Sequence, residues 1–217
     1  MMDIWEPCSF WEGLVLWLRM DEKSGGTVFD HSAYSNHGIA YGAEPTGLGW
    51  DFSETSDYID CGSDDILDIT DAITIEAWIK PSSLPFSSWS RIIRKNTDIT
   101  GLTDGYGFRG RGGFSHIQIW VGNGSSTSFC YLPITTDWNH IVMVYKSGSG
   151  GWGYVNGEEK STLNDVGDID PCSGTSLLLG CSSNAFCGII AGIRIYRRAL
   201  DAEEVKLSYD LNKGLFS

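Results

Sequence analysis

Short apolar segments with a two-residue alternation, separated by glycine-rich turns, restrict this chain to an all-β fold more strongly than any other feature. In the segment ITIEAWIK, residues 73–80, the apolar residues at 73, 75, 77 and 79 share one face. Such alternation is typical of a half-buried strand, and the 27 glycines supply many turns. Further strands are predicted at residues 13–20, 58–61, 91–95, 106–109, 116–121, 128–132, 140–146, 152–155, 176–179 and 188–196.

Two local signals fix a turn and a helix. Asn156-Gly157 follows the predicted strand at residues 152–155 and predicts a two-residue hairpin turn, because both central positions of such a turn need a positive φ. Asp201 with Glu204 forms a capping box, followed by apolar residues at 205 and 209. We therefore expect one short C-terminal helix on an otherwise β protein.

Length and composition indicate a single domain. The 217 residues lie within the range of one sandwich, and we find no linker, low-complexity segment or repeat, so residues 1–217 are assigned to one domain. No run of about twenty apolar residues is present, so membrane insertion is not expected. The first residues lack the basic and apolar regions of a signal peptide.

The formal net charge of −13 argues against nucleic acid and anionic membranes as partners, since both need a basic patch. No Lys or Arg lies between Lys23 and Lys80, whereas this stretch is rich in Asp and Glu. It is either a solvated acidic face or an oxygen-rich cation site. The six cysteines form no CxxC pair, which makes zinc an unexpected ligand. They leave two alternatives open, buried free thiols or a local bridge among Cys172, Cys181 and Cys187.

Six sequence motifs in a fixed order carry a family resemblance. They are GLVLWLRMDEKSGGTVFDHSAYSNHG at 13–38, the Phe and Tyr-Ile segment within 48–62, Ala-Trp-x-x-Pro within 74–81, WNHIV at 138–142, YVNG at 154–157, and RIYRRAL before the capped helix. The chain resembles the LamG-like, concanavalin A-like lectin and glucanase domains from about residue 13 to 211. The resemblance implies a two-sheet antiparallel jelly-roll sandwich. It also implies core positions for Trp17, Trp78 and Trp138 and a hydrogen-bonded sheet position for His140.

The resemblance further implies a structural Ca²⁺ site. Asp30 occupies the position of the family's loop aspartate, and Asn36 could add its side chain. The last strand departs from the family, because Ala191 and Gly192 replace the usual acid pair, and this weakens the expected site. The alternative for Asp30 is a turn in which its carboxylate binds its own backbone.

Sugar sites combine aromatic faces with polar hydrogen-bonding groups. The aromatics least easily assigned to the core are Phe86, Trp89, Phe114, Trp120 and Trp152. The glycine-rich segment 105–113 adds further polar and aromatic groups. We take as ligand-binding residues Trp89, Tyr106, Arg109, Arg111 and Trp152. The alternative is that Tyr106 and Arg109 are ordinary strand residues.

Catalytic signals are missing from the sequence. The paired carboxylates of related glucanases do not occur, and Glu76 is an isolated strand acid that we expect Lys80 to balance. The sequence therefore predicts a non-catalytic recognition domain that binds carbohydrate on a cell or particle surface, in the manner of a lectin or adhesion module. A structural or assembly subunit of a virion or surface layer, with other protein chains as partners and an oligomeric state, is the alternative. A polysaccharide-active enzyme is the third.

Overall fold

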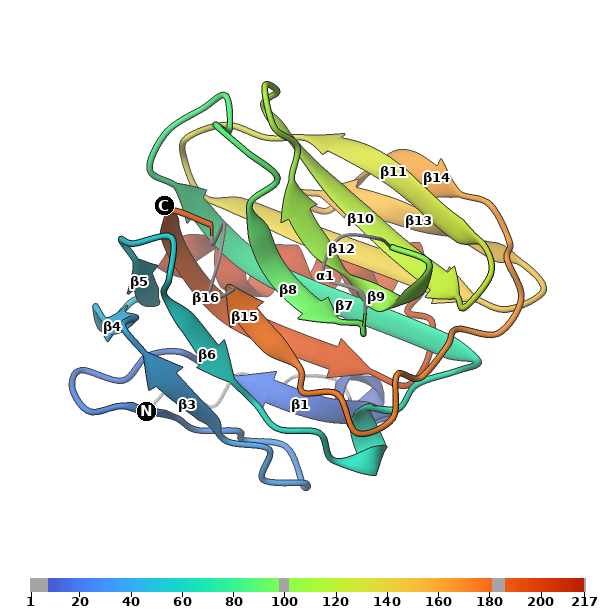
Figure 1. Cartoon of the computed structure of the whole chain (residues 1–217), viewed down its shortest axis with the longest axis horizontal. Coiled ribbons are helices and arrows are strands. Elements are labelled where there is room, and N and C mark those ends of the chain that lie inside the picture. Colours follow the sequence, from blue (N-terminus) through green and yellow to red (C-terminus); the bar gives the residue numbers. More distant parts are fainter. Residues whose placement is uncertain (1–7, 98–101, 181–185, 217) are drawn as a thin grey trace.

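The computed structural model describes residues 8–97, 102–180 and 186–216, and it consists of two antiparallel sheets packed face to face (Figure 1). Sheet A has the order β14-β13-β12-β7-β16-β5-β4, with β1 also pairing with β16. Its strands are β1 (Leu14–Leu18), β4 (Glu44–Pro45), β5 (Trp50–Phe52), β7 (Ala72–Pro81), β12 (Asn139–Lys146), β13 (Gly150–Val155), β14 (Glu158–Leu163) and β16 (Gly188–Tyr196).

Sheet B has the order β11-β10-β9-β8-β15-β6-β3-β2. Its strands are β2 (Thr27–Val28), β3 (Gly38–Tyr41), β6 (Tyr58–Asp60), β8 (Arg91–Lys95), β9 (Asp104–Gly110), β10 (His116–Asn123), β11 (Thr127–Pro133) and β15 (Leu178–Gly180). The 3₁₀ helices η1 (Cys8–Trp11), η2 (Asp65–Leu67) and η3 (Lys213–Leu215) and the helix α1 (Ala202–Asn212) complete the described elements. The predicted jelly-roll sandwich with a short C-terminal helix is confirmed.

The main core lies between the two sheets. The alternating residues Ile73, Ile75 and Ile79 of β7 point into it and are fully buried, as their period of two requires. Sheet B contributes Phe108 and Ile119 to the same interior. The hydrophobic face that the sequence predicts for residues 73–80 is therefore the inner face of sheet A.

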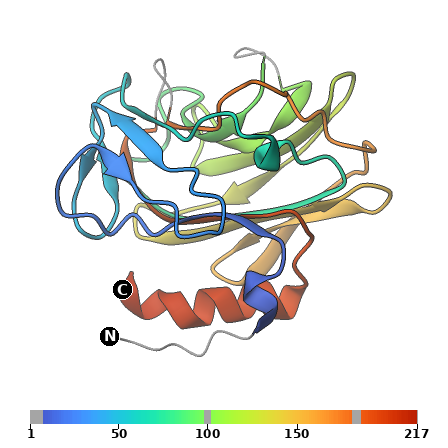
Figure 2. The ribbon, with the colours of Figure 1, turned by 90° about the horizontal axis from the view of Figure 1, so that it is seen from below.

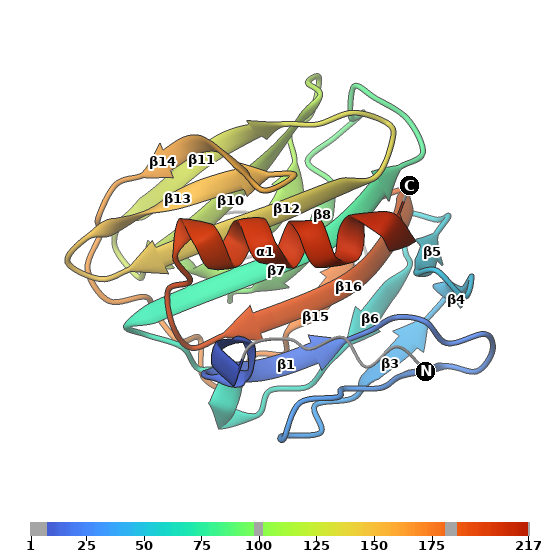
Figure 3. The ribbon, with the colours of Figure 1, turned by 180° about the vertical axis from the view of Figure 1, so that it is seen from behind.

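The helix α1 lies across the outer face of sheet A (Figure 3), and the view from the side shows it as a separate layer beneath the sandwich (Figure 2). The predicted capping box is confirmed: the Asp201 side chain accepts from the Glu204 amide, and Glu204 accepts from the Asp201 amide. None of the helices in the described ranges is long and apolar enough to cross a membrane.

The predicted hairpin turn is also confirmed, since Asn156 and Gly157 have φ angles of 53° and 77° and join β13 to β14. The predicted strands agree with the observed ones to within about three residues at each end. The strands β2 to β5 and β14 were not predicted. The first four have two to four residues each, which is too short for an alternation to be visible. The strand β14 has six residues, but they are mostly polar and exposed, so no apolar alternation marks it.

The expectation that three tryptophans fill the sandwich interior is wrong. Trp17 and Trp78 lie on the outer face of sheet A, and the Trp78 ring stacks on Tyr209 and Phe216 of the C-terminal segment. Trp138 also packs against Phe216. The C-terminal segment therefore covers Trp78 and contacts Trp138, whereas the half-buried Trp17 packs against Trp11 and His31.

Four cysteines in the described part of the chain are free thiols: Cys61, Cys130 and Cys172 are buried, and Cys187 is half-buried. Burial raises the pKa of Cys130 to about 11 and that of Cys172 to about 12, so both stay protonated at neutral pH. Cys181 lies outside the described residues.

Candidate functional site

The outer face of sheet B brings together arginine and aromatic side chains from neighbouring strands. The register pairs Arg109 of β9 with Gln118 of β10, and Gln118 with Tyr131 of β11, so the three side chains form one row on this face. The next row contains Trp120 and Phe129. We name as the arginine–aromatic face the set Trp89, Arg109, Arg111, Phe114, Gln118, Trp120, Phe129 and Tyr131.

The Arg109 side chain is held in one orientation. Its Nε donates to Gln118 Oε1 at 2.7 Å, and its guanidinium lies 4.1 Å from the centre of the Trp89 ring. The indole of Trp89 is 40% exposed, so one of its faces binds the cation while the ring remains accessible. Burial, with the neighbouring charge of Arg91, lowers the pKa of Arg109 to about 10, which still leaves it charged at neutral pH.

Arg111 lies between two rings at the other end of the face. Its guanidinium is 3.8 Å from the Phe114 ring centre and 4.2 Å from that of Tyr131. The Phe114 ring is 45% exposed, and Phe129, next to Tyr131, is 48% exposed. Half-buried cations and accessible rings are therefore interleaved across this surface.

Trp120 forms the floor of the arginine–aromatic face. Its indole lies against Gly107, where an added Cβ would be 2.5 Å from the ring, so only glycine leaves space for it. Trp120 is 1% exposed, and its Nε1 donor has no hydrogen-bond partner. A buried donor without a partner is uncommon, because it costs the energy of a lost hydrogen bond.

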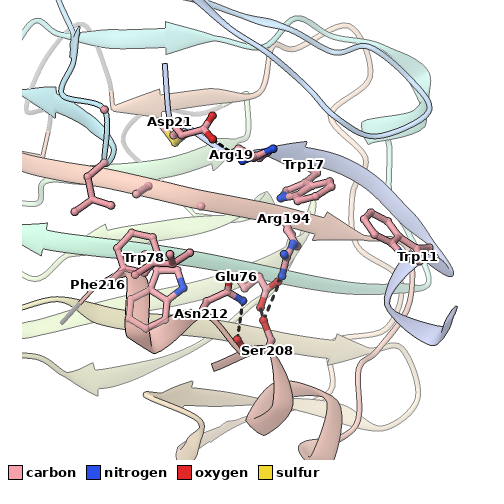
Figure 4. A pocket seen from close by; sticks show the side chains of 16 residues that line it. Trp11, Trp17, Arg19, Asp21, Glu76, Trp78, Arg194, Ser208, Asn212 and Phe216 are labelled. Carbon is pink, nitrogen blue, oxygen red and sulfur yellow. Dashed lines mark hydrogen bonds and ion pairs between the residues drawn. The ribbon is translucent and has the colours of Figure 1, made fainter. Parts of the chain in front are cut away.

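A hollow lies on the opposite side of the molecule from this face, between α1 and the outer face of sheet A (Figure 4). It has a volume of about 650 Å³, and Trp17 and Trp78 line it from two strands. Arg19 and Asp21, which form an ion pair of 2.6 Å, also line it. The charged groups at this hollow are thus matched within the chain.

A buried charge network stabilises this side of the molecule. Glu76 on β7 lies 3.1 Å from Arg194 Nη1 and 3.1 Å from His140 Nε2, and it accepts from the Ser208 hydroxyl of α1 at 2.6 Å. Burial opposes ionisation of Glu76, but its hydrogen bond with His140 and the charge of Arg194 lower its pKa to about 2. The expected pairing of Glu76 with Lys80 is therefore wrong, because Lys80 is exposed at the end of the strand. Glu76 instead connects α1 to the sheet as a permanent anion.

The comparison with known protein families shows which family this chain belongs to. The model of the concanavalin A-like lectin/glucanases superfamily matches residues 52–206. The chain belongs to this superfamily. No curated protein matches the chain in sequence.

Solved structures share the fold over most of the chain. The receptor-binding domain of botulinum neurotoxin D superposes with a TM-score of 0.72 at 15% identity, covering 92% of this chain and 53% of that one. The serotype D domain in complex with N-acetylneuraminic acid gives 0.69 at 16% identity, covering 91% and 50%. This chain thus spans about half the length of the neurotoxin domains that it matches. At these identities the likeness establishes the fold alone.

Within this superfamily fold, three of the five predicted ligand-binding residues come together. Trp89, Arg109 and Arg111 share the arginine–aromatic face. Tyr106 does not, because its ring is fully buried between the sheets and its hydroxyl donates to the Leu67 carbonyl. Trp152 lies in sheet A and packs on the helix-covered side, so it joins no common site with the others.

Other aromatics also differ from their expected roles. Phe86 is in the interior, where its ring lies against Gly110. Gln118, Phe129 and Tyr131 belong to the face but were not singled out. The alternation of β10 and β11 is visible in the sequence, and it could have assigned these three residues to one face.

The loop at Asp30 has few free ligand positions for a cation. Asp30 Oδ1 accepts from the Trp17 and Ser32 amides, and Oδ2 accepts from the Ser32 hydroxyl and the Asn36 amide, at 2.7–2.9 Å. This is the backbone-binding turn that was the alternative to a metal. The described residues contain no group of three or more His, Cys, Asp or Glu side chains that could hold a metal ion. Both carboxylate oxygens of Asp30 are thus engaged by the chain itself, and calcium binding at Asp30 and Asn36 stays a prediction.

Proposed function

We propose that this protein is a non-catalytic recognition domain that binds carbohydrate on the arginine–aromatic face of sheet B. The observation that carries the proposal is the pairing of Arg109 with the exposed ring of Trp89, at 4.1 Å, on a sheet face that no helix of the described ranges covers (Figure 1).

The chemistry of the face suits a sugar. A pyranose has apolar faces of C–H groups, which bind to accessible aromatic rings, and a rim of hydroxyls, which need hydrogen-bond partners. Trp89 and Phe114 supply exposed rings, and Arg109 supplies N–H donors in a fixed fork. Because Gln118 and Trp89 already hold Arg109, little conformational freedom is lost when a ligand binds.

The structural neighbours support the same type of function. One is a botulinum neurotoxin domain in complex with N-acetylneuraminic acid, and another belongs to type C neurotoxin, which depends on two ganglioside molecules for entering cells. Since this chain corresponds to about half of each of those chains, their ligands support glycan binding in general and do not locate the site.

The state of Glu76 supports a role without catalysis. A glycosidase needs a carboxyl group whose pKa is raised, so that it can donate a proton near neutral pH. The pKa of Glu76 is lowered to about 2, and its oxygens bind Arg194, His140 and Ser208. This acid is therefore suited to stabilising the fold and not to proton transfer.

The test is a glycan array probed with the wild-type domain, with Trp89→Ala, and with Trp11→Ala as the matched control. Trp11 is an equally exposed tryptophan, at 47%, but it lies at the hollow under α1. We expect Trp89→Ala to weaken binding at least about tenfold, because burying a large apolar side chain contributes about 1.5–3 kcal/mol. We expect Trp11→Ala to bind like the wild type.

Two results would contradict the proposal. The first is an array on which the wild-type domain binds no glycan. The second is binding that Trp11→Ala abolishes while Trp89→Ala leaves it unchanged. If the domain binds no glycan but self-associates in light scattering, and Trp89→Ala abolishes the association, the face is an assembly interface instead.

A further inference from the structure

Positive charge is concentrated on the arginine–aromatic face, although the chain as a whole carries a net charge of −13. Arg91 pairs in register with Arg109, Arg94 pairs with Gly107 on the next row, and Arg111 follows β9. Four of the 15 basic residues of the chain therefore lie on or beside one sheet face. Such a local excess creates a positive potential within an otherwise negative protein.

Two of these cations have no acidic partner among the residues that the structure describes. Among residues 8–97, 102–180 and 186–216, no carboxylate forms an ion pair with Arg109 or Arg111, and the side-chain contacts of both are with aromatic rings and an amide. By contrast, the half-buried Arg198 forms an ion pair with Glu204 at 2.8 Å. Half-buried guanidinium groups are normally neutralised by an anion, so the face lacks a negative group that a ligand can supply.

The lowered pKa of Arg109 supports the interpretation that the face binds an anionic group. Burial lowers it, and the like charge of Arg91 lowers it further, to about 10. A bound anion favours the charged form of a guanidinium, so it would act against both effects on Arg109. The neighbouring Tyr131 acts in the opposite direction and raises the pKa of Arg109.

We propose that the glycan bound on this face is acidic, and that Arg111 and Arg109 bind its anionic group. This inference rests on the proposed carbohydrate-binding function and specifies the class of ligand. The planar fork of a guanidinium matches the two oxygens of a carboxylate, and a sulfate presents the same geometry. The exposed rings of Trp89 and Phe114 lie beside these two cations and bind the apolar faces of the sugar.

The experiment compares pairs of glycans that differ only in charge. Each acidic oligosaccharide, carboxylated in one set and sulfated in another, is measured by calorimetry beside its neutral counterpart. The neutral counterparts are the carboxyl-reduced alcohol and the desulfated sugar. We expect the acidic member to bind at least about tenfold more tightly at low salt, and this advantage to shrink as the salt concentration rises. The two sets show which anionic group the face prefers.

Variants test whether Arg111 causes the preference for acidic glycans. Arg111→Gln should lose most of the preference for the acidic member, while Arg111→Lys keeps the charge and should lose part of it, because an ammonium lacks the fork. Arg19→Gln, an exposed arginine at the opposite hollow, is the control and should behave like the wild type. Thermal melting of each variant establishes that it is folded.

The outcomes separate the two proposals. Equal affinity for acidic and neutral members, or an acid preference that Arg111→Gln leaves intact, overturns this inference while carbohydrate binding stands. Absence of binding to every member of both sets overturns the proposed function itself.

Discussion

The two outer faces of the sandwich use charged residues in opposite ways. On sheet A, α1 covers the strands, and Glu76, Arg194, His140 and Ser208 satisfy one another in a buried network. On sheet B, Arg109 is supported by Trp89 and Gln118, yet no carboxylate of the described residues neutralises it. Charges that the chain itself neutralises hold the fold together. Charges that it positions without neutralising are available to a ligand. From this difference we propose that sheet A serves stability and sheet B serves recognition.

The largest effect should come from breaking the network on sheet A. Glu76→Gln removes the carboxylate that faces the buried cation Arg194, and we expect the free energy of unfolding to fall by about 3–5 kcal/mol. Urea denaturation measures it. Glu158→Gln, which removes an exposed partner of Lys160, is the control and should leave the urea midpoint unchanged. A Glu76→Gln protein as stable as the wild type would show that the network contributes nothing to the fold.

The same network predicts how stability depends on pH. Because folding lowers the pKa of Glu76 from 4.5 to about 2, its contribution is complete above pH 4.5 and is lost as the pH falls toward 2. The loss should be on the order of 3 kcal/mol, which corresponds to a pKa shift of this size. Urea titrations at several pH values should therefore give a steeper acid loss for the wild type than for Glu76→Gln. Parallel curves for the two proteins would contradict the assignment.

The smallest effect on stability should come from the arginine–aromatic face. Trp89→Ala and Arg111→Gln remove side chains that solvent reaches, so we expect the free energy of unfolding to change by only about 0.5 kcal/mol. This small change is expected even though Trp89→Ala weakens glycan binding and Arg111→Gln loses the preference for acidic glycans. The same urea series measures it. A loss as large as that of Glu76→Gln would mean that the face serves the fold, and the contrast between the two sheets would disappear.

The sequence was sufficient to predict the sandwich because its signals are local. The alternation in 73–80, the Asn156-Gly157 turn and the capping box of Asp201 each depend on residues within a few positions. The alternation showed that Glu76 and Trp78 share a face, but not that α1 covers it, since this depends on contacts more than a hundred positions away, such as Glu76 with Ser208.

The candidate site was only partly predictable for the same reason. The segment 105–113 indicated Arg109 and Arg111, but it also suggested Tyr106, which lies within the same strand and points to the opposite side. Trp89 lies close to Arg109 because β8, which follows Trp89, pairs with β9. Tyr131 lies close to Arg111 although a loop and the strands β10 and β11 separate them in the sequence. These placements follow from strand pairing and register, which composition and spacing do not specify.

The most direct test of the account is to follow the tryptophan side chains by NMR while a bound glycan is titrated. The indole N–H signals are assigned by single Trp→Phe substitutions. If the ligand binds on the arginine–aromatic face, we predict that the signals of Trp89 and Trp120 shift with the ligand. The signals of Trp17 and Trp78 on sheet A should stay in place. Shifts confined to Trp17 and Trp78, at the hollow under α1, would contradict it.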